Sequence, residues 1–166
     1  MTSTGQDHVD WVMAQWAAER PDVDVSPQGL VARLHRVGMR LTEELVAVYA
    51  EHGLGEGEFD VLATLRRSGP PYALTPGDLG AASMVPSGAI TKRVDRCEAR
   101  GWVTRRPSDE DGRSRVVALT ASGRELIDLA FEAHMANEHR LVSMLTERQR
   151  DQLARLLRTW AVALDA

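Results

Sequence analysis

Basic side chains are concentrated in one part of this 166-residue chain, residues 86–115. The segment has eight basic and five acidic residues, a net charge of +3, whereas the rest of the chain carries −7 and the whole chain −4. Guanidinium and ammonium groups bind phosphate, and nucleic-acid binding needs a dense local group of them. A basic segment on an acidic body indicates a protein that binds DNA through one face. The basic residues are Lys92, Arg93, Arg96, Arg100, Arg105, Arg106, Arg113 and Arg115.

A predicted helix-turn-helix positions most of these side chains. Thr75 and Pro76 are an N-cap and a first helical residue, and they begin a short helix through Ala82. Pro86 begins a second helix, which ends at Gly101. Its apolar side consists of Ile90, Val94 and Cys97, so the opposite side faces outward and suits a DNA groove. The groove-facing candidates are Ser87, Gly88, Thr91, Lys92 and Arg96.

A β-hairpin is predicted directly after this helix. Residues 102–104 form one strand, residues 106–114 a polar tip, and residues 115–119 the returning strand. A hairpin in this place is the wing of a winged helix, and Arg113 in its tip is a candidate for the DNA minor groove.

The remaining chain is predicted to be helical. Apolar spacing indicates helices over about residues 6–19, from Ser26-Pro27 to about residue 52, around residues 59–65, from Thr120 to about Leu145, and after the capping box that begins at Thr146. The fold class is therefore mostly α with a small β wing. The wide apolar faces of the terminal helices could fold back on one another or pack against a second copy of the chain.

The hairpin also carries a family signature. Asp111, Arg113, Val117, Leu119 and Thr120 fit Asp-x-Arg, three residues, then Val-x-Leu-Thr, and in this the chain resembles the MarR family of bacterial transcription factors over nearly its whole length. The resemblance implies one unit over residues 1–166, with a winged helix-turn-helix over 56–120 and a helical homodimerisation region over 1–55 and 121–166. It also implies a ligand-responsive regulator, by family default a repressor, on double-stranded operator DNA. A two-fold dimer predicts a pseudo-palindromic operator with half-sites about one helical turn apart.

A finer resemblance is to the urate-responsive branch of that family. It is carried by an N-terminal helix with tryptophan, by the run over residues 58–67, and by arginines on the second helix of the helix-turn-helix and on the first wing strand. The resemblance implies a small anionic effector, such as urate or a carboxylate, bound by Trp16, Asp60, Arg93 and Arg105, with Trp11 as an alternative to Trp16. Arginines grip planar anions by forked hydrogen bonds, and an indole packs on such a ring. The alternative interpretation is that Trp16 is a core residue and Asp60 pairs with an arginine for stability alone.

Other classes of function receive less support. Cys97 could make the chain a redox-sensing regulator, but a thiol on the apolar side of a helix is usually a core residue. The five histidines lack metal-ligand spacing, and no phosphate loop, Gly-x-Ser-x-Gly or His-Glu-x-x-His motif occurs, so we expect no metal, no cofactor and no enzyme activity. A protein-interaction module without DNA remains an alternative. No apolar run spans about 20 residues and no signal-peptide pattern begins the chain, so we expect a cytoplasmic protein without a membrane partner.

Overall fold

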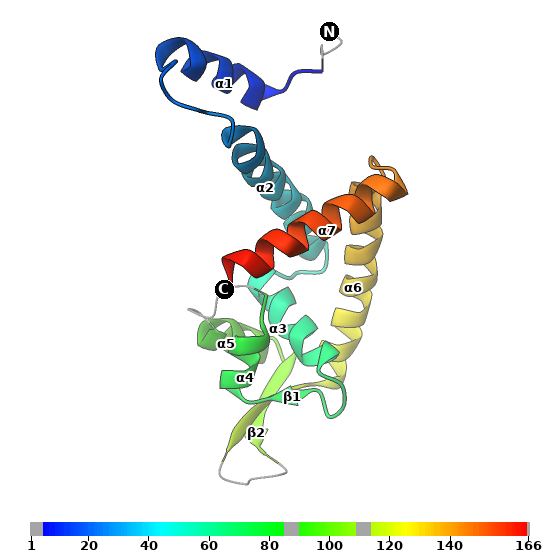
Figure 1. The fold of residues 1–166 in the computed structure, drawn as a ribbon. Coiled ribbons are helices and arrows are strands. Elements are labelled where there is room, and N and C mark those ends of the chain that lie inside the picture. Colours follow the sequence, from blue (N-terminus) through cyan, green and yellow to red (C-terminus); the bar gives the residue numbers. More distant parts are fainter. Residues whose placement is uncertain (1–4, 85–89, 109–113, 166) are drawn as a thin grey trace. The chain divides into compact units, whose positions relative to one another are not determined.

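The computed structural model describes residues 5–84, 90–108 and 114–165. As predicted, the fold is mostly helical with a small sheet (Figure 1). The chain forms two compact units, Met1–Glu44 and Leu45–Ala166, which are described separately. The elements are α1 (His8–Glu19), α2 (Gln28–Glu51), α3 (Glu56–Arg67), β1 (Ala73–Leu74), α4 (Pro76–Ala82), α5 (Ile90–Ala99), β2 (Val103–Pro107), β3 (Arg115–Leu119), α6 (Ala121–Val142) and α7 (Glu147–Leu164).

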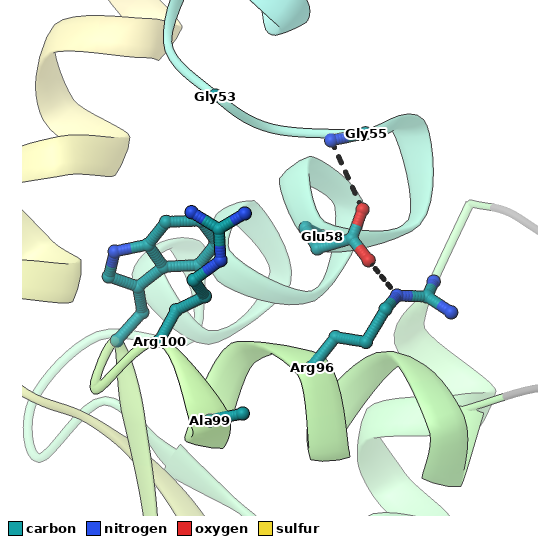
Figure 2. Close-up of a pocket in the computed structure, with 7 residues that line it drawn as sticks. Gly53, Gly55, Glu58, Arg96, Ala99 and Arg100 are labelled. Atoms are coloured by element: carbon teal, nitrogen blue, oxygen red, sulfur yellow. Dashed lines mark hydrogen bonds and ion pairs between the residues drawn. The ribbon is translucent and has the colours of Figure 1, made fainter.

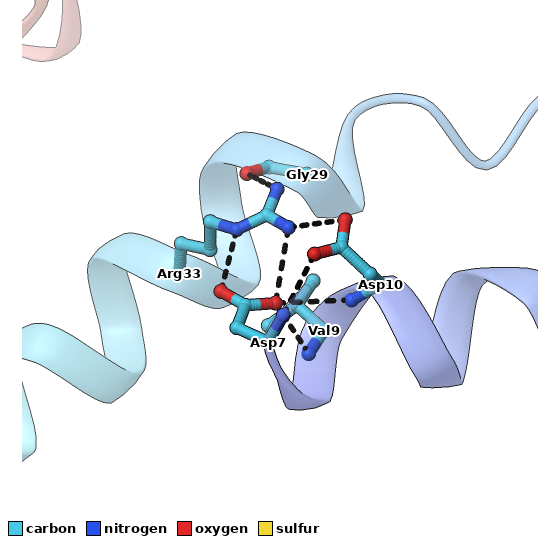
Figure 3. Close-up of polar contacts among 5 residues, drawn as sticks. All are labelled: Asp7, Val9, Asp10, Gly29 and Arg33. Carbon is cyan, nitrogen blue, oxygen red and sulfur yellow. Dashed lines mark hydrogen bonds and ion pairs between the residues drawn. The ribbon is translucent and has the colours of Figure 1, made fainter. Parts of the chain in front are cut away.

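In the first unit, one arginine joins the start of α1 to α2 (Figure 3). Asp7 is the N-cap of α1, and its Oδ1 accepts the backbone N–H groups of Val9 (2.8 Å) and Asp10 (3.0 Å). Arg33 on α2 donates from Nε to Asp7 Oδ2 (2.7 Å), from Nη2 to Asp10 Oδ1 (2.5 Å), and from Nη1 to the Gly29 carbonyl (2.9 Å). Hydrogen bonding from Arg33 holds the pKa of Asp7 well below its ordinary value. The predicted first helix is confirmed, with its N-cap at Asp7.

The core of the second unit is built around α3. Leu62 and Leu65 on this helix have no exposed surface, and Phe59 stacks on Tyr49 of α2 with ring centroids 3.9 Å apart. Side chains from every later element except α7 pack into the same cluster. The buried members after α3 are Leu79, Val94, Cys97, Val103, Val117, Ile127 and Ala130.

The sheet has three antiparallel strands in the order β1-β3-β2. The sequence missed β1, because a strand of only two residues shows no periodicity; it pairs with β3 through Ala73 opposite Ala118. β2 extends to Pro107, so the wing strand is longer than predicted and the tip correspondingly shorter. The predicted wing residue Arg113 lies outside the described residues.

The helix ends follow local capping chemistry. The hydroxyls of Thr75, Thr120 and Thr146 accept the N3 backbone N–H of α4, α6 and α7, as their spacing predicts. α6 ends at Val142, slightly before the predicted end. No helix within the described residues is long and apolar enough to cross a bilayer.

Candidate functional site

The two sides of α5 differ as the sequence predicts. Val94 and Cys97 are buried in the core, whereas Thr91 and Lys92 are exposed. The core therefore fixes the rotation of α5 and keeps the side that carries Lys92 in solvent. The described part of α5 begins at Ile90, so the two candidates Ser87 and Gly88 lie outside the described residues.

Arg96, the remaining groove-facing candidate on α5, reaches toward α3 (Figure 2). Its Nε donates to Oε1 of Glu58. The other carboxylate oxygen of Glu58 accepts the backbone N–H of Gly55 at 3.1 Å, at the start of α3. Glu58 thus joins the N-terminus of α3 to α5, the second helix of the predicted helix-turn-helix, which we call the reader helix. Glu58 also compensates part of the positive charge of Arg96.

A cavity of about 370 Å³ lies beside this ion pair (Figure 2). In it the guanidinium carbon of Arg100 stands 5.5 Å from the ring centroid of Trp102, within the range of a cation–π contact. Neither Arg100 nor Trp102 was predicted as a site residue, although the spacing of Arg96 and Arg100 by four positions indicates a shared side of the helix. The lining residues are Gly53, Gly55, Glu58, Arg96, Ala99, Arg100 and Trp102.

Asp60 and Arg93, two of the predicted ligand-binding residues, lie side by side. Asp60 is buried, at 6% exposure, and the Arg93 side chain is 12% exposed. Oδ2 of Asp60 is 3.9 Å from Nη1 of Arg93, and Oδ1 accepts the backbone N–H of Met84 at 3.0 Å. Nη1 of Arg93 is buried and makes no hydrogen bond within the described residues. A buried guanidinium nitrogen without an acceptor is a place where an anion could bind.

Gly57 makes room for the Arg93 side chain. A Cβ atom on Gly57 would lie 2.9 Å from both Cδ and Nε of Arg93. Because Gly57 has no side chain, the guanidinium of Arg93 can lie close to α3, next to Asp60.

Arg105, the third predicted ligand residue, contacts different carboxylates. Its side chain donates to Asp95 and Glu98, both on α5, and its backbone N–H donates to Glu98 Oε1 at 3.1 Å. The side-chain hydrogen bond to Asp95, and after it the one to Glu98, raise the pKa of Arg105 above its usual value. The structure therefore ties Arg105 to the reader helix.

The two candidate tryptophans lie on α1, in the first unit. Trp16 is 47% exposed and Trp11 58% exposed, so neither is a core residue of the single chain. The alternative interpretation of Trp16 as core is thus not supported within one chain.

Cys97 is fully buried, and burial raises the pKa of its thiol to about 12. The reactive form of cysteine is the thiolate, so a raised pKa suppresses its chemistry. We expect thiol reagents at pH 8 to label native Cys97 at least about a hundred-fold more slowly than the urea-unfolded chain. The labelling rate of the two states, followed by mass spectrometry, checks this. Equal rates, or modification of the native thiol by dilute peroxide, would support the redox-sensing alternative.

Comparison with known proteins identifies relatives of the chain. The model of the MarR family matches residues 52–114. The HTH-type transcriptional regulator PecS of Dickeya dadantii is 39% identical over 146 residues, which cover 88% of each chain. The transcriptional repressor MprA of Escherichia coli (strain K12) is 30% identical over 76% of this chain and 71% of its own. Among solved structures, an E. coli MarR mutant complexed with operator DNA has a TM-score of 0.69 and 26% identity, covering 82% of this chain and 94% of that one.

Proposed function

This chain belongs to the MarR family of transcriptional regulators, and from that premise we propose that it is a sequence-specific DNA-binding repressor whose α5 enters the major groove. The observation that carries the proposal is the sidedness of α5. Its core side is buried through Val94 and Cys97, and its exposed side presents Thr91 and Lys92. The solved relative bound to operator DNA supports the same use of the fold.

Each candidate has a role in this proposal. Lys92 and Thr91 contact phosphates or base edges, and Arg96 does so with the guanidinium nitrogens that Glu58 does not engage. Ser87 and Gly88 permit close approach of the backbone to the DNA, and Arg113 enters the minor groove. These assignments combine the exposed side of α5 with the resemblance of the wing sequence.

A homodimer would present two such readers. Within the described residues α7 has no buried residue, although it carries several large apolar side chains, and α6 and α2 expose further ones. Exposed apolar faces of this extent are typical of a protein interface. We propose that these helices form the dimer and that the operator is pseudo-palindromic, with half-sites about one turn apart. The exposed apolar residues include Leu34, Val37, Leu129, Phe131, Leu153, Leu156, Leu157 and Val162.

Replacing Arg113 with alanine is expected to weaken operator binding at least about tenfold and to reduce the slope of log affinity against log salt by about two units, because each protomer of the dimer loses one cationic contact. Gel-shift titrations with the DNA upstream of the gene for this protein, at several stated salt concentrations, measure both. Arg148→Ala, on the exposed first turn of α7, removes an equal charge as the control. If affinity and slope both stay at wild-type values in Arg113→Ala, the wing assignment is wrong. If the wild-type protein shows no preference for promoter DNA over random duplex, the result supports the alternative of a protein-interaction module that does not bind DNA.

The regulatory ligand in this proposal is a small anion, urate or a carboxylate, at the Asp60–Arg93 pair. Arg93 supports it with a buried guanidinium nitrogen that makes no hydrogen bond within the described residues, 3.9 Å from the carboxylate. Because Arg93 lies on α5, an anion bound to it would bias the position of the reader helix. Arg105 and Trp16, or Trp11, complete the proposed set, and Arg105 would exchange its carboxylate partners on α5 to reach the ligand. Tighter binding of the effector to the DNA-incompetent arrangement releases the operator.

A further inference from the structure

We propose that Asp95 and Glu98 are positioning residues, which hold the wing at a set place relative to the reader helix by binding Arg105. We name Asp95, Glu98 and Arg105 the wing clamp. This inference rests on the proposed DNA-binding function, because it concerns how two DNA-contacting elements are kept in register. Neither carboxylate is assigned a contact with DNA or effector.

Three hydrogen bonds form the wing clamp. Glu98 accepts twice from the same residue, once from the backbone N–H of Arg105 at 3.1 Å and once from its guanidinium. Asp95, one helical turn earlier on α5, accepts from the other terminal guanidinium nitrogen. The Arg105 side chain is only 27% exposed, so the contact is partly shielded from solvent. Because one of these hydrogen bonds comes from the backbone N–H of Arg105, the wing clamp holds the strand β2 itself as well as the Arg105 side chain.

The position of Arg105 in the sheet makes that bond informative. β2 is an edge strand, since the order is β1-β3-β2, and Arg105 stands opposite Val117 of β3. The carboxylate of Glu98 thus satisfies a backbone N–H of an edge strand that the sheet itself does not bond. The wing clamp thus joins α5 to the edge of β2 through the Arg105 backbone N–H, which cannot rotate independently of the strand.

The two joined elements carry the two proposed DNA contacts. α5 presents Thr91 and Lys92, and β2 continues toward the hairpin tip that contains Arg113. Val103 belongs to the same buried cluster as Cys97, and this burial holds the start of β2 in the core. Arg105 lies two residues further along the strand, where the clamp sets the direction in which β2 leaves the core. The clamp therefore determines the separation between the major-groove and minor-groove contacts.

Removal of Glu98 gives a test in which electrostatics and the clamp act in opposite directions. Loss of a carboxylate on the reader helix strengthens binding to any DNA, because repulsion of the phosphates falls. Loss of the clamp weakens only the operator, because the wing is no longer aligned. We therefore expect the ratio of operator to random-duplex affinity to fall at least about tenfold in Glu98→Ala. Glu98→Gln should lose less, because its amide oxygen still accepts the Arg105 N–H.

The readouts separate the two elements. Gel shifts at one stated salt concentration give both affinities, with Glu56→Ala at an exposed position of α3 as the matched charge control. Hydroxyl-radical footprints of Glu98→Ala should lose the minor-groove protection from the wing while dimethyl sulfate protection in the major groove remains. If operator and random-duplex affinities rise together with an unchanged ratio, or if the wing footprint persists, the proposal is overturned. Circular dichroism confirms folding. If Glu98→Ala is unfolded, Asp95→Ala, which removes the more exposed carboxylate of the wing clamp, decides the outcome by the same affinity ratio and footprints.

Amide hydrogen exchange in the free protein tests the clamp without DNA. The Arg105 N–H should exchange at least about tenfold faster in Glu98→Ala than in wild type, and at a near wild-type rate in Glu98→Gln. An unchanged rate in Glu98→Ala overturns the clamp whatever the DNA results are. Faster exchange in a protein whose wild type shows no operator preference would instead refute the proposed function and leave the clamp as a feature of the fold.

Discussion

A Gly123→Ala substitution is expected to lower the free energy of unfolding by about 3 kcal/mol or more, the upper end of overpacking effects. Gly123 is buried in the first turn of α6, and a Cβ atom there would lie 1.9 Å from the carbonyl oxygen of Trp102 and 2.8 Å from its carbon. The oxygen is held in place, since it accepts the Thr120 backbone N–H at 3.0 Å and the Thr120 hydroxyl at 3.1 Å. The clash therefore involves backbone that cannot move without loss of hydrogen bonds. Urea denaturation measures the change as a lower midpoint with an unchanged slope.

Gly77→Ala is the matched control in the same unit. A Cβ atom on Gly77 would have an ordinary contact, 3.8 Å from the Thr75 hydroxyl, and alanine is the better helix former. We expect its unfolding midpoint to be unchanged or slightly higher. Similar midpoints for the two variants would show that α6 and the residue before β2 do not approach each other as the structure has them.

Loss of effector response is the second large effect that we expect. In Arg93→Ala, the effector concentration that halves operator occupancy should rise at least about tenfold, because the buried guanidinium would no longer bind the anion. Asp60→Asn should also change the response, and it keeps an oxygen for the Met84 N–H, so the turn after α4 keeps its hydrogen bond. Gel shifts with urate, and in parallel with citrate, measure the release of DNA.

Asp128→Asn is the control for this experiment, because it removes an aspartate that pairs with an arginine elsewhere, Arg66 at 2.7 Å. It should release DNA at the wild-type effector concentration. If Arg93→Ala and Asp60→Asn also did so, the effector would bind at another place, and the cavity beside Arg100 and Trp102 would be the next site to test. If neither anion released the wild-type protein, the effector class would be wrong while the DNA assignments would stand.

The helices and the two sides of the reader helix could be predicted from the amino-acid sequence. Capping depends on residues three positions apart, so Thr75, Thr120 and Thr146 could be recognised from their neighbours alone. The apolar side of α5 follows in the same way from the spacing of Val94 and Cys97. Family membership was also readable, because the wing signature is a run of adjacent residues.

The partners of the charged side chains, in contrast, depend on how the elements pack in the folded chain. From the sequence, Arg96 was predicted to bind DNA and Arg105 an anionic effector. In the structure Arg96 contacts Glu58 on α3, and Arg105 contacts two carboxylates on α5. Long side chains choose partners across elements, and helical or strand spacing says nothing about distances between elements. β1 likewise exists because β3 lies beside residues 73–74, and not because of its own two residues. Local periodicity therefore fixes what each segment becomes, whereas packing fixes the ion pairs through which the segments act together.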